Sequence, residues 1–461
     1  MTLGGAFVRT IRHFWPDMNR WLDGVADTRV QRFVTYHKAF LIWLGLGIHL
    51  FRLGARRQLD FEMGGDQEQE AIFLANLNRL AATHQHTLPV NGTLEHYVSD
   101  HMGWEPLEQV RNQMLRRLMR MKALDMTRLL DYRLVLLDAT GHLSFDHKHC
   151  DHCLTQTHGG KTSYYHSVLE AKLVGPQAMV LSMASEFMDN SVMPPPTQGQ
   201  SKQDYKQDCE LAAFQRLAPK LKQAFPQTAL CLCGDSLYGC GPAISICREH
   251  GWGFVFTLKQ GRAPALWQEF CTLLDLCPHN GQRVQLPDGG YEVYRWVNGL
   301  DYTDSHGQAH RLNAIDYVAT SKDATAVSHW AWITGFTVTP KNVVAIANQA
   351  GRARWKIENE GINIQKNDGY DLEHAYSHHE VGLRVFYLLL QLAHLMMQVF
   401  ERGSLLKRLA QQAGKRNIKA FFGKSLNVAR RLLEAFRNVC IETEAFDPNG
   451  ARPMQIRFDS S

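Results

Sequence analysis

Short apolar runs that alternate with helical segments constrain the fold of this chain more than any other feature. Residues 133–141 (RLVLLDATG) and 229–239 (ALCLCGDSLYG) are apolar runs of strand length that end in turn residues, so each predicts a buried strand. Two further strands are expected at 165–174 and 254–259, with helices at 204–224 and 242–250. Strands and helices that alternate in this way are typical of an α/β fold with one central sheet.

The regions on either side of these strands have different patterns. Apolar residues recur at helical spacing before residue 130 and again after residue 381, whereas 284–332 holds short β-like runs between turn residues. We therefore expect an α/β core that a β-rich insertion interrupts. The expected divisions are a helical N-terminal region at 1–128, a first core part at 129–262, the insertion at 263–328, the completion of the core at 329–380, and a helical, basic C-terminal region at 381–461.

Composition favours a soluble globular protein of several domains. The chain has 461 residues, of which 45% are hydrophobic and 21% charged, and its net charge of +5 permits a nucleic-acid partner without requiring one. Residues 39–51 are too short to span a membrane as a helix, and Gln391, His394 and Gln398 interrupt the apolar run at 385–400, which predicts a buried helix instead. Met1 is not followed by a secretory leader, so we expect a cytoplasmic protein with reduced thiols.

Three carboxylates stand apart from the other acidic residues. Asp138 and Asp235 each follow an apolar run, at the edge of a sheet where sites usually open, and Glu358 lies in a predicted helix four residues after Arg354. Carboxylates in such places need a partner, and oxygen ligands suit the hard divalent cations that catalyse phosphoryl transfer. Each residue also has a structural reading, as a cap, a turn or a surface ion pair. Asp208 is a lesser rival, with capping of a helix as its simpler role.

Three segments resemble the acidic motifs of DDE transposases from bacterial insertion sequences, in the branch with a β insertion before the last Glu. The segments are LLDATG at 136–141, GDSLYG at 234–239 and, most specifically, GRARWKIENEG at 351–361 followed by GYDLEHAY at 369–376. The resemblance implies a ribonuclease H-like core and two Mg²⁺ or Mn²⁺ ions. It assigns Asp138, Asp235 and Glu358 as catalytic metal ligands, with Glu360 as a neighbouring acid.

The resemblance also implies DNA as the partner. Arg354 matches the Arg of a related signature, Tyr-x2-Arg-x3-Glu-x6-Lys, but Gly351 stands at the Tyr position and Gln365 at the Lys position, with Lys366 beside it. Arg354 and Lys366 are thus candidates for DNA phosphate contacts, and Trp355 for stacking on a base.

The activity that the resemblance implies is cleavage at the ends of the element and joining of the 3′-hydroxyls to target DNA. A homodimer on paired DNA ends is then expected, acting on the bacterial nucleoid, with no membrane partner and no nucleotide cofactor. Basic faces in the helical regions, including one at 111–128, are expected to bind double-stranded DNA, although a merely solvated face is the simpler reading.

A loop rich in His and Cys at 147–158 is a second candidate site. Cys150 and Cys153 form a Cys-x2-Cys pair, and His158 adds a third ligand of the kind that structural Zn²⁺ takes. Free thiols in a polar loop are the alternative.

Other functions stay open at this point. A ribonuclease H-like metal-dependent nuclease would share the acids without strand joining, a non-catalytic DNA-binding relative would not need them, and a zinc hydrolase would use the His/Cys loop. The absence of GxxxxGK[ST], of GxGxxG in a strand–helix setting and of GxSxG argues against a nucleotide-dependent helper protein and a serine hydrolase.

Overall fold

The computed structural model describes residues 1–62, 65–192, 207–323, 325, 327–447 and 456–458. The chain divides into two compact units. Unit 1 consists of Met1–Met126, Gly175–Met183 and Glu360–Ser461, and unit 2 consists of Thr127–Val174 and Ala184–Asn359. Of the helix predicted at 204–224, residues 204–206 lie outside the described residues, 207–209 are not helical, and the helix itself runs over Glu210–Ala224.

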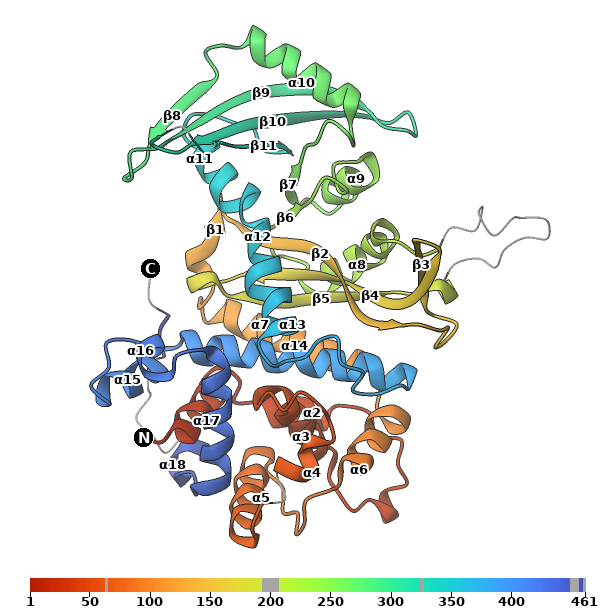
Figure 1. The fold of residues 1–461 in the computed structure, drawn as a ribbon, viewed down its shortest axis with the longest axis vertical. Coiled ribbons are helices and arrows are strands. Elements are labelled where there is room, and N and C mark those ends of the chain that lie inside the picture. Colours follow the sequence, from red (N-terminus) through yellow and green to blue (C-terminus); the bar gives the residue numbers. More distant parts are fainter. Residues whose placement is uncertain (63–64, 193–206, 324, 326, 448–455, 459–461) are drawn as a thin grey trace, which may run out of the picture. The chain divides into compact units, whose positions relative to one another are not determined.

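Unit 2 is built on a large mixed sheet, so the expected α/β class is confirmed. The strands follow the order β3-β4-β2-β6-β7-β11-β10-β9-β8, with β1 paired to β2 and β5 paired to β4 (Figure 1). The strands are β1 (Arg128–Leu129), β2 (Tyr132–Phe145), β3 (Leu154–His158), β4 (Lys161–Val174), β5 (Val180–Met188), β6 (Leu230–Gly234), β7 (Gly253–Thr257), β8 (Gly281–Gln285), β9 (Tyr291–Thr303), β10 (Ala309–Thr320) and β11 (Val327–Thr334).

The centre of this sheet is parallel and fully buried. Strand β2 pairs in parallel with β6, and β6 pairs in parallel with β7. Every residue of β6 and β7 is buried, as are residues 133–137 of β2. Parallel strands covered on both faces need such continuous apolar runs, which explains why the sequence pattern revealed them. Helices α8 (Glu210–Ala224) and α9 (Gly241–Glu249) follow β5 and β6 in the chain.

The predicted β insertion extends the main sheet. Strand β11 pairs antiparallel with β7, and β10, β9 and β8 follow in antiparallel order. Helix α10 (Pro264–Leu276) packs along β9 and buries Leu266, Phe270 and Leu274, which recur at helical spacing (Figure 1). The insertion therefore also contains a helix, which we did not expect from its β-rich sequence.

Two further elements of unit 2 differ from the sequence expectations. Strand β2 does not end at Asp138 but continues to Phe145, because β4 pairs with it along its second half. Strand β5 was not predicted, although the run VLSMASEFM is apolar enough for a buried strand.

Unit 1 is helical. Its helices are α1 (Leu3–Phe14), α2 (Met18–Asp23), α3 (Lys38–Leu50), α4 (Gln58–Glu62), α5 (Gln67–Ala81), α6 (Asn91–His96), α7 (Glu105–Arg120), α13 (Asn363–Asn367), α14 (Glu380–Arg402), α15 (Ser404–Gln412), α16 (Ile418–Phe422), α17 (Ser425–Asn438) and α18 (Thr443–Phe446). Helix α14 is long and apolar enough to cross a membrane, but 89% of its apolar window is buried inside the protein. It is the core helix of this unit, as its sequence predicted.

Candidate functional site

The sheet places Asp138 and Asp235 side by side. Strands β2 and β6 are parallel, and their register pairs Leu136 with Cys233. Each Asp lies two residues beyond its member of this pair, so the same register sets Asp138 opposite Asp235. Neighbouring strands lie about 4.8 Å apart, and residues two apart point to the same face. Asp235 lies directly after the end of β6, and its negative charge acts on Asp138, so the two carboxylates lie near each other where the parallel pairing ends.

A tight turn after β6 fixes the Asp235 side chain. Its Oδ1 accepts a hydrogen bond of 2.8 Å from the backbone N–H of Leu237, which closes the turn. A Cβ at Gly234 would lie 2.6 Å from the ring of Tyr238, so only glycine lets this ring pack back over the end of the strand. The packing of Tyr238 against Gly234 therefore explains why these two residues accompany Asp235 in the GDSLYG segment.

Glu358 and Arg354 come from a helical segment that follows β11. The segment consists of α11 (Val343–Ala345), a π-helical turn at Ile346–Gly351, α12 (Arg354–Lys356) and a second π-helical turn at Ile357–Ile362 that contains Glu358. Such π turns occur mostly as single turns within helices, frequently at functional sites.

The charges of these residues act on one another. Burial raises the pKa of Asp138 to about 6; the negative charges of Asp235 and Glu358 add to this rise, and the positive charge of Arg354 opposes it. Two carboxylates that share a site cannot both ionise freely in the absence of a counter-charge. The three predicted acids and Arg354 therefore form one electrostatic group in unit 2, which we call the acid group.

The acid group is open rather than compact. The Glu358 residue is exposed, while Asp138 and Asp235 are half-buried. Among the described residues, the groups whose ligand atoms all lie within 4.8 Å of one another do not include these three carboxylates. In this conformation the three acids therefore do not surround a single ion. Glu360, the neighbouring acid, belongs to unit 1, where it lines a cavity of about 270 Å³ with Arg52 and Tyr370.

Glu210 is a fourth acid that the sequence reasoning missed. It is the first residue of α8, and its Oε1 accepts a hydrogen bond of 2.6 Å from the hydroxyl of Tyr238. Burial raises the pKa of Glu210 to about 7, with further contributions from the charges of Asp138 and Asp235. Asp208, the expected rival, is instead a structural acid, since it is ion-paired at 2.6 Å with Arg216.

Tyr238 is the signal that could have identified Glu210. A buried Tyr needs a partner for its hydroxyl, and the GDSLYG segment places this Tyr three residues after Asp235. The sequence alone, however, does not predict that the first residue of α8 is the partner of the Tyr238 hydroxyl.

The helical segment is fixed to the extended sheet. Arg352 donates hydrogen bonds of 3.1 Å to Glu292 of β9 and to the hydroxyl of Tyr317 of β10, and Asn348 donates one of 2.8 Å to the hydroxyl of Tyr294. The β insertion thus positions the segment that carries Glu358. The sequence did not predict this role.

The unusual Gly351 has a steric cause. A Cβ at this position would lie 2.6 Å from the ring of Trp332, which is buried in the core. Trp332 therefore occupies the space that a side chain at the Tyr position of the signature would need. Trp355 is 48% exposed and contacts Trp330 edge to face at a centroid distance of 5.8 Å, so its ring is accessible to a ligand.

The structure does not place Lys366 in the acid group. Lys366 belongs to unit 1, where it forms an ion pair of 2.7 Å with Glu373. Gln365, at the Lys position of the signature, is buried and hydrogen-bonded to Gln391 and His394. Arg111, counted in the basic face at 111–128, is also buried, 3.1 Å from the hydroxyl of Ser182.

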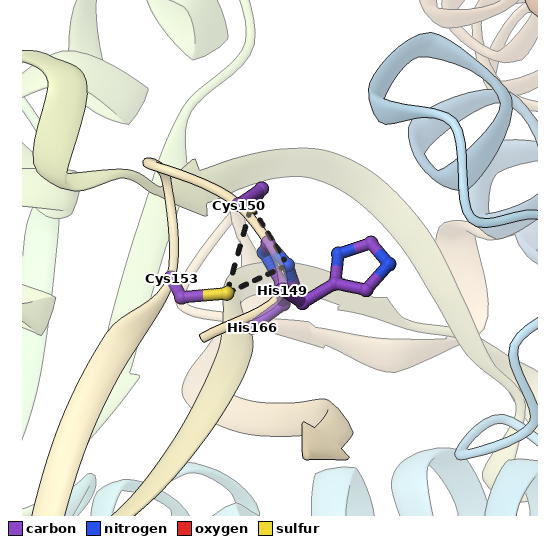
Figure 2. Close-up of side chains that lie close together, drawn as sticks. All are labelled: His149, Cys150, Cys153 and His166. Atoms are coloured by element: carbon purple, nitrogen blue, oxygen red, sulfur yellow. Dashed lines mark hydrogen bonds between the residues drawn. The ribbon is translucent and has the colours of Figure 1, made fainter. Parts of the chain in front are cut away.

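The Cys/His loop forms a cluster whose members differ from those predicted. Cys150 and Cys153 are joined by His149 and His166, and one ligand atom from each lies within 4.8 Å of the others (Figure 2). His158 is not among them, which corrects the expected ligand set. It ends β3, where it pairs with Lys161 at the exposed turn into β4. The sequence did not identify His166, because it lies within a strand far along the chain from the Cys-x2-Cys pair.

The sequence was compared with protein-family models and with curated proteins, and no match was found in either comparison.

Proposed function

We propose that this protein is a DNA transposase of the DDE type, which cleaves the ends of an insertion sequence and joins their 3′-hydroxyls to target DNA. One observation carries the proposal: the register of two parallel strands sets Asp138 beside Asp235, and the charge of Glu358 acts on the same site. These are the three acids that the sequence resemblance assigns.

The strand order supports the ribonuclease H-like core that the resemblance implies. The run β5-β4-β2-β6-β7 has an antiparallel β4–β2 pair and parallel β2–β6 and β6–β7 pairs. Asp138 and Asp235 each lie two residues beyond the last parallel pair of β2 and β6, at the edge where open α/β sheets usually bind their ligands.

The donor set suits divalent cations. Burial is the main cause of the raised pKa of Asp138, and the negative charges of Asp235 and Glu358 add to it. A fourth carboxylate, Glu210, lies near enough for the charges of Asp138 and Asp235 to raise its own pKa. Hard oxygen ligands of this kind are what Mg²⁺ and Mn²⁺ take. The sequence resemblance implies two such ions, and we assign Asp138, Asp235 and Glu358 jointly to them. Bound ions would activate the attacking oxygen and stabilise the leaving oxygen of a phosphodiester.

Arg354 and Glu210 have supporting roles in this proposal. The positive charge of Arg354 partly opposes the rise in pKa that burial causes at both Asp138 and Glu210, so its guanidinium lies near these acids. A cation in that position can contact the scissile phosphate while the carboxylates hold the metal ions. The hydrogen bond from Tyr238 holds the carboxylate of Glu210 at the edge of the group. Glu210 is thus a positioning residue that links α8 to the turn after β6.

Exposed basic residues on and between the last helices of unit 1 are suited to DNA phosphates. They are Lys415, Arg416, Lys419, Lys424, Arg430 and Arg431. Lys and Arg that neutralise phosphates supply most non-specific DNA affinity, so we assign this surface to the DNA backbone. Trp355, with its exposed ring, is assigned to a base near the cleaved end.

The test is a strand-transfer assay with purified protein, Mg²⁺ or Mn²⁺, and DNA that carries the sequences flanking the gene. We expect end cleavage and joined products from the wild type, and neither from Asp138→Asn, Asp235→Asn or Glu358→Gln. Glu249→Gln, which removes an exposed carboxylate of α9 in unit 2, is the matched control and should retain activity. Cleavage without joining would favour the nuclease, and full activity of Asp235→Asn would exclude metal catalysis at these acids.

A further inference from the structure

We propose that His149, Cys150, Cys153 and His166 bind one structural Zn²⁺ ion that fixes the loop between β2 and β3. The inference does not rest on the proposed function. It follows from the geometry of this cluster and from the contacts that the loop makes with its surroundings (Figure 2).

The sheet register brings two of the ligands together. Strands β3 and β4 are antiparallel, and Leu154 pairs with Tyr165. The next pair along the same register is Cys153 with His166, so their side chains lie on one face of the hairpin. Cys150 reaches the same point because two residues separate it from Cys153, a spacing common in structural zinc sites. His149 directly precedes Cys150 in the chain.

The distances match those around a tetrahedral zinc ion. The Sγ atoms of Cys150 and Cys153 are 3.5 Å apart, and each lies 3.5 Å from Nε2 of His166. A tetrahedral zinc ion with bonds of about 2.3 Å to sulfur and about 2.0 Å to nitrogen separates its ligand atoms by roughly 3.4–3.8 Å. The three atoms thus form one face of the expected tetrahedron, and a ring nitrogen of His149 within 4.8 Å supplies the fourth corner.

The ligand types select zinc and a structural role. Two thiolates and two imidazoles suit Zn²⁺ and not the Mg²⁺ or Mn²⁺ expected at the acid group. Four protein ligands leave no open position for a substrate. The site is also distinct from the acid group: Asp138 pairs with Glu170, and His166 lies four residues before Glu170 in β4, about 14 Å away at 3.4 Å per residue.

Neighbouring residues show what the ion would stabilise. Phe145 stacks on the ring of His149 at a centroid distance of 4.4 Å and provides an apolar cover. The amide of Asn190 donates a 2.8 Å hydrogen bond to the carbonyl of Cys153, and its Oδ1 accepts one of 3.0 Å from the N–H of Asp208. Asp208 lies two residues before Glu210. The zinc-bound loop would therefore support the start of α8 and, through it, the position of Glu210.

The test is the metal content of the full-length protein, purified under reducing conditions without added metal. We expect about one zinc per chain, lost from Cys150→Ser, Cys153→Ser and His166→Gln. Cys271→Ser, an exposed cysteine of α10, and His158→Gln are the matched controls and should retain zinc.

Cobalt gives a second measurement that does not depend on the variants folding. Wild-type protein stripped by a chelator and titrated with Co²⁺ should acquire the absorption of a tetrahedral ion with sulfur-to-metal charge transfer, and Zn²⁺ should displace it. Wild type that binds neither zinc nor tetrahedral cobalt while its thiols are reduced would overturn the assignment. Loss of zinc from His158→Gln, with retention by His166→Gln, would overturn this ligand set. Neither measurement involves DNA cleavage, so each is independent of the proposed activity.

Discussion

Replacing Asp138 with Asn should make the metal-free protein more stable at alkaline pH, although it removes a residue assigned to catalysis. The carboxylate has a pKa of about 6 in the folded protein, compared with an ordinary value of 3.8, chiefly because it is buried and because Asp235 and Glu358 repel its charge. Asparagine has nearly the same shape and no charge. Residues at functional sites often cost stability in this way.

The magnitude follows from the difference between the two pKa values. This difference corresponds to about 3 kcal/mol at pH values above both. Because folding raises the pKa, the penalty is small near about pH 4, grows as the pH rises towards about 6, and is complete above it. The free energy of unfolding of Asp138→Asn, measured relative to the wild type, should therefore be about 2–3 kcal/mol higher at about pH 8 than at about pH 4. For a unit of about this size, the gain corresponds to a rise in Tm of roughly 4–12 °C.

The assay is thermal unfolding in EDTA at both pH values. Comparing the two pH values cancels any pH-independent effect of the amide, and Asp275→Asn, an exposed Asp of α10, is the control and should show no such difference. Addition of Mg²⁺ should stabilise the wild type more than Asp138→Asn, because only the wild type keeps the full ligand set. An effect of Asp138→Asn that is the same at both pH values would refute the electrostatic reasoning.

Three other variants test separate parts of the account. Gly351→Ala should destabilise unit 2 by about 1–3 kcal/mol in urea unfolding, because the added methyl group would overlap the ring of Trp332; an unchanged midpoint would show that this ring moves freely. Tyr238→Phe should cost about 1–3 kcal/mol, and more at about pH 8 than at about pH 5, because its hydroxyl stabilises the ionised form of a carboxylate whose pKa is about 7; equal losses at both pH values would contradict this. The double variant Lys415→Ala/Lys419→Ala should lower the slope of log affinity for duplex DNA against log salt by about 2, and an unchanged slope would exclude these residues from the DNA surface.

The parallel strands were predictable because of how they are buried. Strands β6 and β7 are covered on both faces, so their sequences are continuous apolar runs, and Asp235 is recognisable as the polar residue that follows such a run. The same reasoning found α14 as a buried helix. It failed for the end of β2, since the pairing that extends this strand to Phe145 comes from β4 and is not encoded locally.

Long-range contacts could not be read from the sequence. Glu210 lies at the edge of the acid group only because α8 begins beside Tyr238, and His166 joins the cysteines only because β3 and β4 are in a particular register. His158 was chosen as a zinc ligand because it is close to the cysteines in the sequence. The β3–β4 hairpin instead brings in His166, which lies further along the chain. Gly351 was noticed as a departure from the family signature, but its cause, the ring of Trp332, lies on a distant strand.

The most direct test of the central claim is anomalous X-ray scattering from crystals of the protein grown with Mn²⁺ and a DNA end. The account predicts manganese peaks within about 2.0–2.3 Å of carboxylate oxygens of Asp138, Asp235 and Glu358, with a phosphodiester of the DNA beside them. Manganese bound elsewhere, with these three carboxylates holding no ion while DNA occupies the protein, would contradict it.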